Sequence, residues 1–243
     1  MAESCITRTP FASLIATIMC IIGVAVFLGT MYAAVDGTMG LAYQQFGSRV
    51  SWVDVLKFVM LAIGCGMGLM GFVLLLLGFL ATGSTRDAVY KGSKSRTGGR
   101  CCLSFFMVVS YIMTICWLMI TSWMCLNMSL FLIFWGFCKQ DPEVRPGCLD
   151  LTQFHYMFRM FTKGRMNVCD QNLQNFCEKS DELYGLYIVA YVSSLVVLLS
   201  LIHYMICLAA NYAHVKDSEK LQEWEEARYL EEQELGTMST DRY

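Results

Sequence analysis

The sequence predicts an all-α membrane protein with four transmembrane helices and a disulfide-bridged second extracellular loop. Of its 243 residues, 56% are apolar, and four long intervals contain no Asp, Glu, Lys or Arg. Each interval exceeds the roughly 20 residues that a helix needs to cross a bilayer. Four of the twelve cysteines lie together in the polar interval between the third and fourth stretches. The uncharged intervals are Thr9–Val35, Phe58–Thr85, Cys101–Cys138 and Leu183–Val215.

The distribution of charge predicts the orientation of the chain. The connection after the second stretch contains five Lys or Arg residues and one acidic residue, Asp87. Short loops rich in Lys and Arg stay in the cytoplasm, so both termini are expected there. The expected segments are the cytoplasmic N-terminus 1–9, transmembrane helices 10–34, 53–81, 103–137 and 183–211, extracellular loops 35–52 and 138–182, the basic cytoplasmic loop 82–102 and the acidic cytoplasmic tail 212–243. The third uncharged run is longer than a bilayer requires, so its last turns, near 130–137, are expected to project beyond the lipid.

Small residues recur along the first two helices. In a bilayer such ridges let helices approach closely. The spacings predict one helix-packing face on each helix, and packing within the chain is favoured over a dimer interface. The residues on these faces are Ala12, Ala16, Cys20 and Gly23 in the first helix and Gly64, Gly68, Gly71 and Gly78 in the second.

Few polar side chains lie within the helices. Asp54 and Lys57 stand three residues apart at the entrance of the second helix, where a pair at the membrane interface is expected. His203 in the fourth helix is interpreted as a packed or hydrogen-bonded side chain rather than a proton relay. A transport or pore function would have to use these three residues and Asn127, which lie at scattered depths.

The cysteine framework belongs to the second extracellular loop, where an oxidising compartment preserves disulfides. Its cysteines are Cys138, Cys148, Cys169 and Cys177, which allow three connectivities that the residues alone do not distinguish. Bridges matter here because so short a segment builds little core of its own. The candidate partner-binding residues are Tyr156, Phe158, Arg159 and Phe161, whose types are enriched at protein interfaces. The alternative is that these rings pack on the bridges.

Two further features lie on the cytoplasmic side. Cys101 and Cys102 abut the third helix, a position that suits reversible palmitoylation; buried free thiols are the alternative. The tail from Lys216 contains nine acidic and four basic residues, and its apolar residues recur every three, which indicates a helical continuation. The last three residues, Asp241–Tyr243, have a form that some PDZ domains capture, although an unbound tail is favoured.

Several motifs resemble the proteolipid protein family, which contains myelin proteolipid protein and the neuronal membrane glycoproteins. The opening Cys5-x4-Pro10-Phe-Ala-Ser-Leu-Ile-Ala-Thr-Ile-Met-Cys20 carries the resemblance first. Further similarity lies in Ala81-Thr-Gly83 with Arg86, in Trp135-x-x-Cys138, in the order of the four loop cysteines and in Ala209-Ala-Asn-Tyr-Ala-His-Val-Lys216. The resemblance covers most of residues 5–216.

The resemblance implies four spans, cytoplasmic ends, and nested bridges that join Cys138 to Cys177 and Cys148 to Cys169. It also implies acylation at Cys5, and more loosely at Cys101 and Cys102. The single N-terminal cysteine, the short basic loop and the acidic tail depart from the myelin protein. They are typical of a short, invertebrate-type member of the neuronal glycoprotein branch. That branch is associated with cell-surface shape, neurite and filopodium outgrowth, and epithelial junctions.

The function predicted is that of a non-enzymatic protein of the plasma membrane, enriched at cell contacts or projections. The sequence contains no zinc-type His pair, phosphate-binding glycine loop or nucleophile–base arrangement, so no cofactor, metal or nucleic acid is expected. The leading hypothesis is contact or junction organisation through the bridged loop and lateral helix packing. The alternatives are a pore or transporter and an organiser of lipid domains. Expected partners are membrane lipids, including cholesterol-rich domains, other membrane or junction proteins, a second copy of the chain and a PDZ protein.

Overall fold

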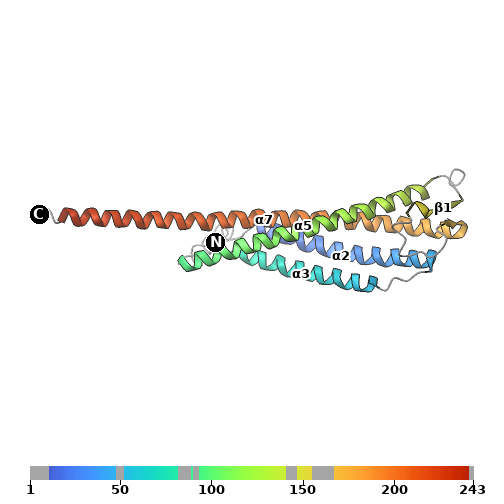
Figure 1. The fold of residues 1–243 in the computed structure, drawn as a ribbon, viewed down its shortest axis with the longest axis horizontal. Coiled ribbons are helices and arrows are strands. Elements are labelled where there is room, and N and C mark those ends of the chain that lie inside the picture. The colour runs from blue at the N-terminus through green and yellow to red at the C-terminus, as the bar shows by residue number, and fades with distance from the viewer. Residues whose placement is uncertain are drawn as a thin grey trace, which may run out of the picture. The chain divides into compact units, whose positions relative to one another are not determined.

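A computed structural model describes residues 11–47, 52–81, 89, 93–140, 147–154 and 167–240. Four long helices account for most of this part of the chain, and a two-stranded antiparallel sheet lies between the last two (Figure 1). All four helices are long and apolar enough to cross a membrane. The predicted class is confirmed. In chain order the elements are α2 (Phe11–Phe46), α3 (Trp52–Leu80), α5 (Ser93–Cys138), β1 (Cys148–Asp150), the 3-10 helix η1 (Leu151–Phe154), β2 (Asn167–Cys169) and α7 (Asp170–Thr240).

The first predicted loop, 35–52, is a helix over most of its length, so its expected start after Ala34 is wrong. Helix α2 continues to Phe46 despite two glycines in its last turns. Leu41 and Ala42 are 7% and 6% exposed there, so burial outweighs the low helix propensity of glycine. The helix ends where Gly47 adopts a φ of +65° and its N–H bonds to the carbonyl of Tyr43 at 2.8 Å.

Other expected boundaries also shift toward longer helices. Helix α7 begins at Asp170 rather than near residue 183, so Cys177 lies in a helix and not in a loop. Helix α5 begins at Ser93, inside the expected basic loop 82–102. The predicted helical continuation of the tail is present, since α7 runs to Thr240. Hydropathy marks the part of a helix that can lie in lipid, whereas backbone hydrogen bonds continue through polar sequence.

The chain divides into two compact units, each containing segments of all four long helices. We call Ile18–Met70 with Ile115–Leu199 the bridged unit, because it contains both disulfides. We call Met1–Thr17, Gly71–Thr114 and Ser200–Tyr243 the tail unit.

Aromatic packing and close helix approach organise the core of the bridged unit. Trp117 is 1% exposed and meets Phe27 edge to face at 5.2 Å between ring centroids. Its indole N–H donates to the sulfur of Met67 at 3.3 Å. These three side chains come from α5, α2 and α3, so one cluster joins three helices.

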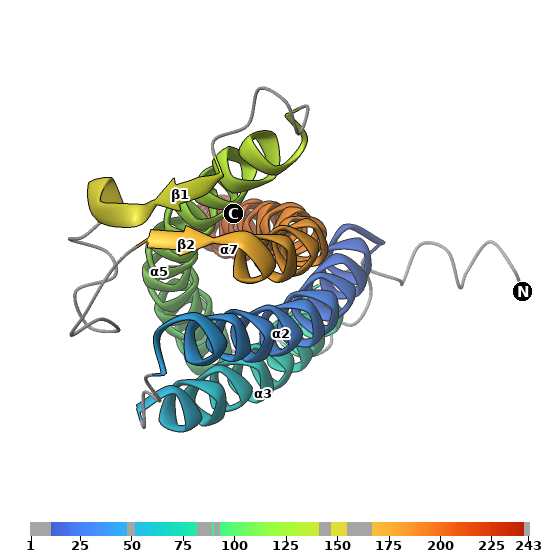
Figure 2. The ribbon, with the colours of Figure 1, turned by 90° about the vertical axis from the view of Figure 1, so that its right-hand side faces the viewer.

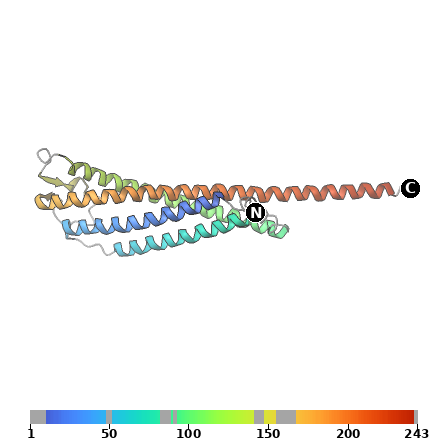
Figure 3. The same ribbon diagram turned by 180° about the vertical axis from the view of Figure 1, so that it is seen from behind.

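A buried hydrogen-bond chain organises the tail unit. The Tyr204 hydroxyl, on a side chain that is 1% exposed, donates to the Thr17 hydroxyl at 2.8 Å and lies 3.4 Å from the Gly71 carbonyl oxygen. The Thr17 hydroxyl donates in turn to the Ser13 carbonyl at 2.7 Å. The chain therefore joins α7 to α2 and α3. Beyond it, α7 continues past the other helical segments of this unit (Figure 3).

Most residues of the two predicted packing faces are buried, with one exposed residue on each face. Ala16 is fully buried, and a Cβ atom added to Gly23 would lie 2.8 Å from Val197 Cγ2 and 3.2 Å from its backbone nitrogen. Ala12 is exposed, however, and Ser13 is buried in its place.

On α3 the same kind of error occurs at one glycine. Gly64, Gly71 and Gly78 are buried, and a Cβ on Gly64 would lie 2.2 Å from Leu28 Cδ1. Gly68 is exposed with open space around it, and Met67 is buried instead. An α-helix has 3.6 residues per turn, so residues spaced four apart move gradually away from one face of the helix. Positions that alternate between steps of three and four stay on the same, buried face.

Candidate functional site: the disulfide-bridged lobe

The candidate site is a small lobe at one end of the bridged unit. We define the lobe as residues 147–154 and 167–182, which comprise the hairpin, η1 and the first turns of α7. Figure 2 shows the hairpin beside the last turns of α5 and the start of α7. Disulfides join Cys138 to Cys177 and Cys148 to Cys169. The nested pattern that the family resemblance implies is therefore present in the structure.

The hairpin is short, and the side chains of its central residue pair are buried. Cys148 is paired with Cys169, and Leu149 with Val168. Leu149 and Val168 are 9% and 3% exposed, and Leu151, which follows in η1, is fully buried. The inner disulfide thus connects directly opposed strand residues, and the apolar side chains beside it exclude water from the hairpin centre.

An Asx turn closes the end of β1. The backbone N–H of Thr152 donates to Asp150 Oδ1 at 2.8 Å, and the Thr152 hydroxyl donates to the same oxygen. Both hydrogen bonds favour the ionised carboxylate and so hold the pKa of Asp150 below its usual value. The turn directs the chain from β1 into η1.

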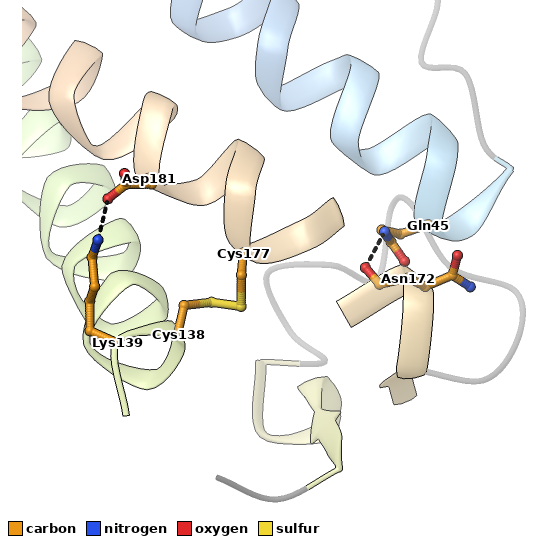
Figure 4. The surroundings of a disulfide bond; sticks show 6 residues. All are labelled: Gln45, Cys138, Lys139, Asn172, Cys177 and Asp181. Carbon is orange, nitrogen blue, oxygen red and sulfur yellow. Dashed lines mark hydrogen bonds and ion pairs between the residues drawn. A yellow bond between two sulfur atoms is a disulfide. The ribbon is translucent and has the colours of Figure 1, made fainter. Parts of the chain in front are cut away.

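The junction between β2 and α7 depends on one unusual backbone angle. Asp170 has a φ of +53°, in the left-handed region that Asp tolerates better than most non-glycine residues. It is also the acidic residue of the first turn of α7, where negative charge favours the helix dipole. Two residues later, the Asn172 carbonyl accepts a hydrogen bond from Gln45 Nε2 at 3.2 Å (Figure 4). The end of α2 is therefore bonded to the start of α7.

Aromatic contacts between α5 and α7 lie below the lobe. Phe134 meets Phe176 edge to face at 5.3 Å, and Trp135 stacks on Tyr184 at 5.4 Å. One turn earlier along α5, Phe131 stacks at 4.8 Å on the ring of Tyr187.

The hydroxyl of Tyr187 forms a 3.0 Å hydrogen bond with that of Thr38 on α2. Aromatic pairs add about 0.5–1.5 kcal/mol beyond the area that they bury. The lobe thus stands on a base that three helices build together.

The outer disulfide and an ion pair close this base at the surface. Cys138 and Cys177 have Cα atoms 5.4 Å apart, and Lys139 Nζ lies 3.6 Å from Asp181 Oδ1 (Figure 4). Both charged side chains are more than half exposed, so the ion pair contributes less than about 1 kcal/mol. The disulfides close 39 and 21 residues of chain, for which the chain-entropy model gives roughly 3–4 kcal/mol each. Each disulfide therefore contributes more to the stability of the lobe than the ion pair does.

Several predicted site residues lie outside the described part of the chain. These are Cys5, the four candidate partner-binding residues Tyr156, Phe158, Arg159 and Phe161, and the tail end Asp241–Tyr243. Cys101 is exposed and Cys102 half-buried near the start of α5. Acylation and partner binding therefore stay predictions.

The polar residues within the helices do not form one site. Lys57 Nζ lies 2.5 Å from Asp36 Oδ1 and 4.6 Å from the centroid of the Tyr32 ring, so its partner is not Asp54 as predicted. Asn127 Nδ2 donates to a carbonyl of its own helix, that of Trp123, at 2.9 Å. His203 is exposed on α7, so the packed alternative is wrong, whereas the hydrogen-bonded alternative stays a prediction. Within the described ranges, no group of three or more His, Cys, Asp or Glu is arranged to hold a metal ion.

Sequence reasoning missed the contacts that fasten the lobe. The pairs Gln45–Asn172 and Trp135–Tyr184 join residues of different helices, and Lys139–Asp181 joins the turn after α5 to α7. Only one signal pointed to them: Trp135 stands three residues before Cys138, and residues at that spacing share a helix face.

A helical membrane protein with four spans and a disulfide-braced lobe between the last two spans is the class that this structure defines. The sequence matches the family of myelin proteolipid protein (PLP or lipophilin) over residues 1–220. The chain belongs to that family.

Curated relatives align along nearly the whole chain. Neuronal membrane glycoprotein M6-a of Mus musculus is 30% identical over 251 residues, covering 98% of this chain and 90% of the relative. Proteolipid protein DM beta of Squalus acanthias shows the same identity and coverage. Neuronal membrane glycoprotein M6-b of Mus musculus is 28% identical over 248 residues, covering 95% of this chain and 75% of the relative. No solved structure matches the chain.

Proposed function

We propose that the protein is a non-enzymatic component of the plasma membrane that organises cell–cell contacts through its bridged lobe. Both termini lie in the cytoplasm and the lobe faces outward. The orientation is supported by the five cations of the 82–102 connection and by the two disulfides, which persist in an oxidising compartment. Relatives named neuronal membrane glycoproteins are consistent with a role at the cell surface.

One observation carries this proposal: the described residues on both sides of the segment 155–166 are fixed in place. It follows η1, whose first residue Leu151 is fully buried, and it precedes β2, whose Cys169 is bridged to Cys148. Its sequence combines three aromatic residues with three cations and no acidic residue. Fixed residues on either side of a binding segment reduce the conformational freedom that binding removes, and so lower its entropy cost. The composition suits an acidic protein surface on the neighbouring cell.

The proposal is tested with the bridges left intact. Arg159→Ser with Phe161→Ser removes a cation and a ring from the segment, and Lys220→Ser with Leu221→Ser makes a matched change in the cytoplasmic tail. We expect wild type and the tail variant to gather where expressing cells touch, and the segment variant to spread evenly at the surface. Surface biotinylation verifies equal delivery. Unchanged enrichment of the segment variant at contacts would refute the proposal.

Acylation is a second part of the proposal. Thioester-linked chains on Cys5, Cys101 and Cys102 would bias the protein toward particular lipid environments, and the exposed thiol of Cys101 at the start of α5 supports this. Hydroxylamine-sensitive capture on a thiol resin measures it. Replacing all three cysteines by Ser should abolish capture, while Cys65→Ser, at an exposed thiol of α3, should leave it intact. Equal capture of the triple variant and wild type would contradict this assignment.

A further inference from the structure

The tail unit contains a shallow, open groove that the proposed function does not use. One face of α5 forms its floor and Tyr212 of α7 forms its wall. Because the lining positions on α5 follow one another at alternating steps of three and one residues, they form a stripe along the helix about 16 Å long. The groove is lined on α5 by Thr97, Arg100, Cys101, Ser104, Phe105 and Val108.

One end of the groove is polar and cationic. Arg100 Nη1 bonds to the carboxylate of Glu219, and its guanidinium carbon lies 5.8 Å from the centroid of the Tyr212 ring. Thr97 and Ser104 add exposed hydroxyls on the α5 side. A guanidinium has five N–H donors in a planar fork that matches the geometry of a phosphate. Glu219 and Tyr212 hold this fork in place from the α7 side.

The other end of the groove is apolar. The side chains of Phe105 and Val108 are 61% and 56% exposed, and the uncharged run of α5 begins just before them, at Cys101. The preceding connection contains five cations and one acidic residue. The groove therefore crosses the point where a spanning helix passes from a charged aqueous segment into lipid.

We propose that this groove binds one anionic phospholipid of the adjoining leaflet. Its phosphate lies at Arg100 and one acyl chain lies along Phe105 and Val108. An occupant must be amphiphilic because the lining changes from cationic to apolar within three turns, and phospholipids are the amphiphiles that surround a spanning helix. The guanidinium at the polar end, together with the cations that the sequence gives the preceding connection, favours an anionic headgroup over a zwitterionic one. This inference is independent of the lobe.

Glu219 gives the proposal a distinctive signature. Its carboxylate occupies one side of the Arg100 guanidinium and repels an anionic headgroup. Neutralising Arg100 should therefore weaken lipid binding, whereas neutralising Glu219 should strengthen it. If the Arg100–Glu219 pair served only to join α5 to α7, both changes would act in the same direction. Opposite signs separate a binding site from a structural contact.

The experiment is native mass spectrometry of the full-length protein in detergent. Hydroxylamine treatment first removes thioester-linked chains. Phosphatidylserine and phosphatidylcholine with identical acyl chains are then titrated separately. We expect wild type to bind one phosphatidylserine more tightly than phosphatidylcholine, Arg100→Gln to reduce this preference about fivefold, and Glu219→Gln to increase it. The control Arg228→Gln, at a cation of the α7 tail outside the groove, should leave it unchanged.

Three outcomes would overturn the proposal. The first is an unchanged preference in Arg100→Gln, and the second is a reduction by Glu219→Gln that equals that of Arg100→Gln. The third is displacement of bound phosphatidylserine by millimolar inorganic phosphate, which would show that the acyl chain is not held. If Arg100→Gln does not fold, Ser104→Trp fills the groove without a change of charge. It should then abolish the single bound phosphatidylserine, and retention of that lipid would also overturn the proposal.

Discussion

The bridged unit and the tail unit contain segments of the same four helices, but different interactions stabilise them. The bridged unit has two disulfides, interhelical aromatic pairs and a glycine that brings backbones together. The tail unit has the hydrogen-bond chain of Tyr204 and the ion pair between Arg100 and Glu219. In the part of α7 that continues past the other helices of this unit, the side chains of Leu221, Trp224 and Leu230 are 59–64% exposed. Covalent and aromatic contacts are therefore concentrated beneath the lobe.

The largest effect should follow removal of the outer bridge. Cys138→Ser with Cys177→Ser should destabilise the lobe by roughly 3–4 kcal/mol, because the closed stretch of chain gains conformational freedom when the lobe opens. Hydrogen exchange of amides 167–182 should accelerate, while amides 200–215 of the tail unit keep their protection. Cys116→Ser, at an exposed free thiol of α5, is the matched control. Equal acceleration in both units would show that the bridge does not act locally.

Close helix approach in the bridged unit should produce the next largest effect. A methyl group at Gly23 would lie 3.2 Å from Val197 N and 3.3 Å from the Ser193 carbonyl oxygen, which are backbone atoms that cannot move aside alone. Gly23→Ala should therefore destabilise the unit by about 1–3 kcal/mol.

Gly29 provides the matched control, since it has open space around it on the same helix. Gly29→Ala should be neutral or stabilising, because alanine favours a helix more than glycine does. Thermal unfolding in detergent measures both variants. Equal melting temperatures would contradict the approach of α2 to α7 at Gly23.

The tail unit should respond more weakly to a single substitution. Tyr204→Phe removes the hydrogen bond to Thr17 but keeps the buried ring. Interhelical hydrogen bonds of membrane proteins contribute about 0.6 kcal/mol on average and up to about 1.7. The variant should lose an amount in that range in reversible unfolding, whereas Tyr111→Phe, at an exposed ring of the same unit, should lose nothing measurable. If Tyr204→Phe lowered the free energy of unfolding as much as removal of the Cys138–Cys177 disulfide does, the expected difference in stabilisation between the two units would be wrong.

The smallest effect concerns pH and the Asx turn of the lobe. The hydrogen bonds from Thr152 lower the pKa of Asp150 below 3.8, so its contribution is present above pH 3.8 and is lost as pH falls through the lowered pKa. Asp150→Asn should remove this part of the acid sensitivity. Hydrogen exchange of amides 147–154 reports the stability of the lobe. Measured between pH 5 and pH 3 in both proteins, it gives the difference in their acid sensitivity. An identical pH dependence in both proteins would place the sensitivity elsewhere.

Patterns along the chain were enough to predict the class and the main spans. Runs without charge identify four spans because lipid excludes ionised side chains, and four cysteines outside those runs indicate a covalently closed loop. Helix ends were less predictable. The turns of α2 after Ala34 depend on burial of Leu41 and Ala42, and this burial requires the neighbouring helices to be in place.

Contacts between elements could not be predicted from spacing. Asp54 stands closer to Lys57 in sequence, yet Lys57 pairs with Asp36, which α2 brings near it. Gln45 and Asn172 are 127 residues apart and meet only because the end of α2 lies beside the start of α7. Likewise, Gly68 looked equivalent to Gly64 and Gly71, but Met67 occupies the buried face. Which residues contact one another therefore depends on how the helices are arranged in space.

The central claim is that the bridged lobe directs the protein to cell contacts. The most direct measurement is the ratio of fluorescence at contacts to fluorescence at free edges, for a cytoplasmically tagged protein in a monolayer at matched surface density. Wild type should exceed a ratio of one, whereas the Cys138→Ser, Cys177→Ser variant and the Cys148→Ser, Cys169→Ser variant should both approach one. A ratio above one that persists without either bridge would contradict the account and place the sorting signal in the helices or the tail.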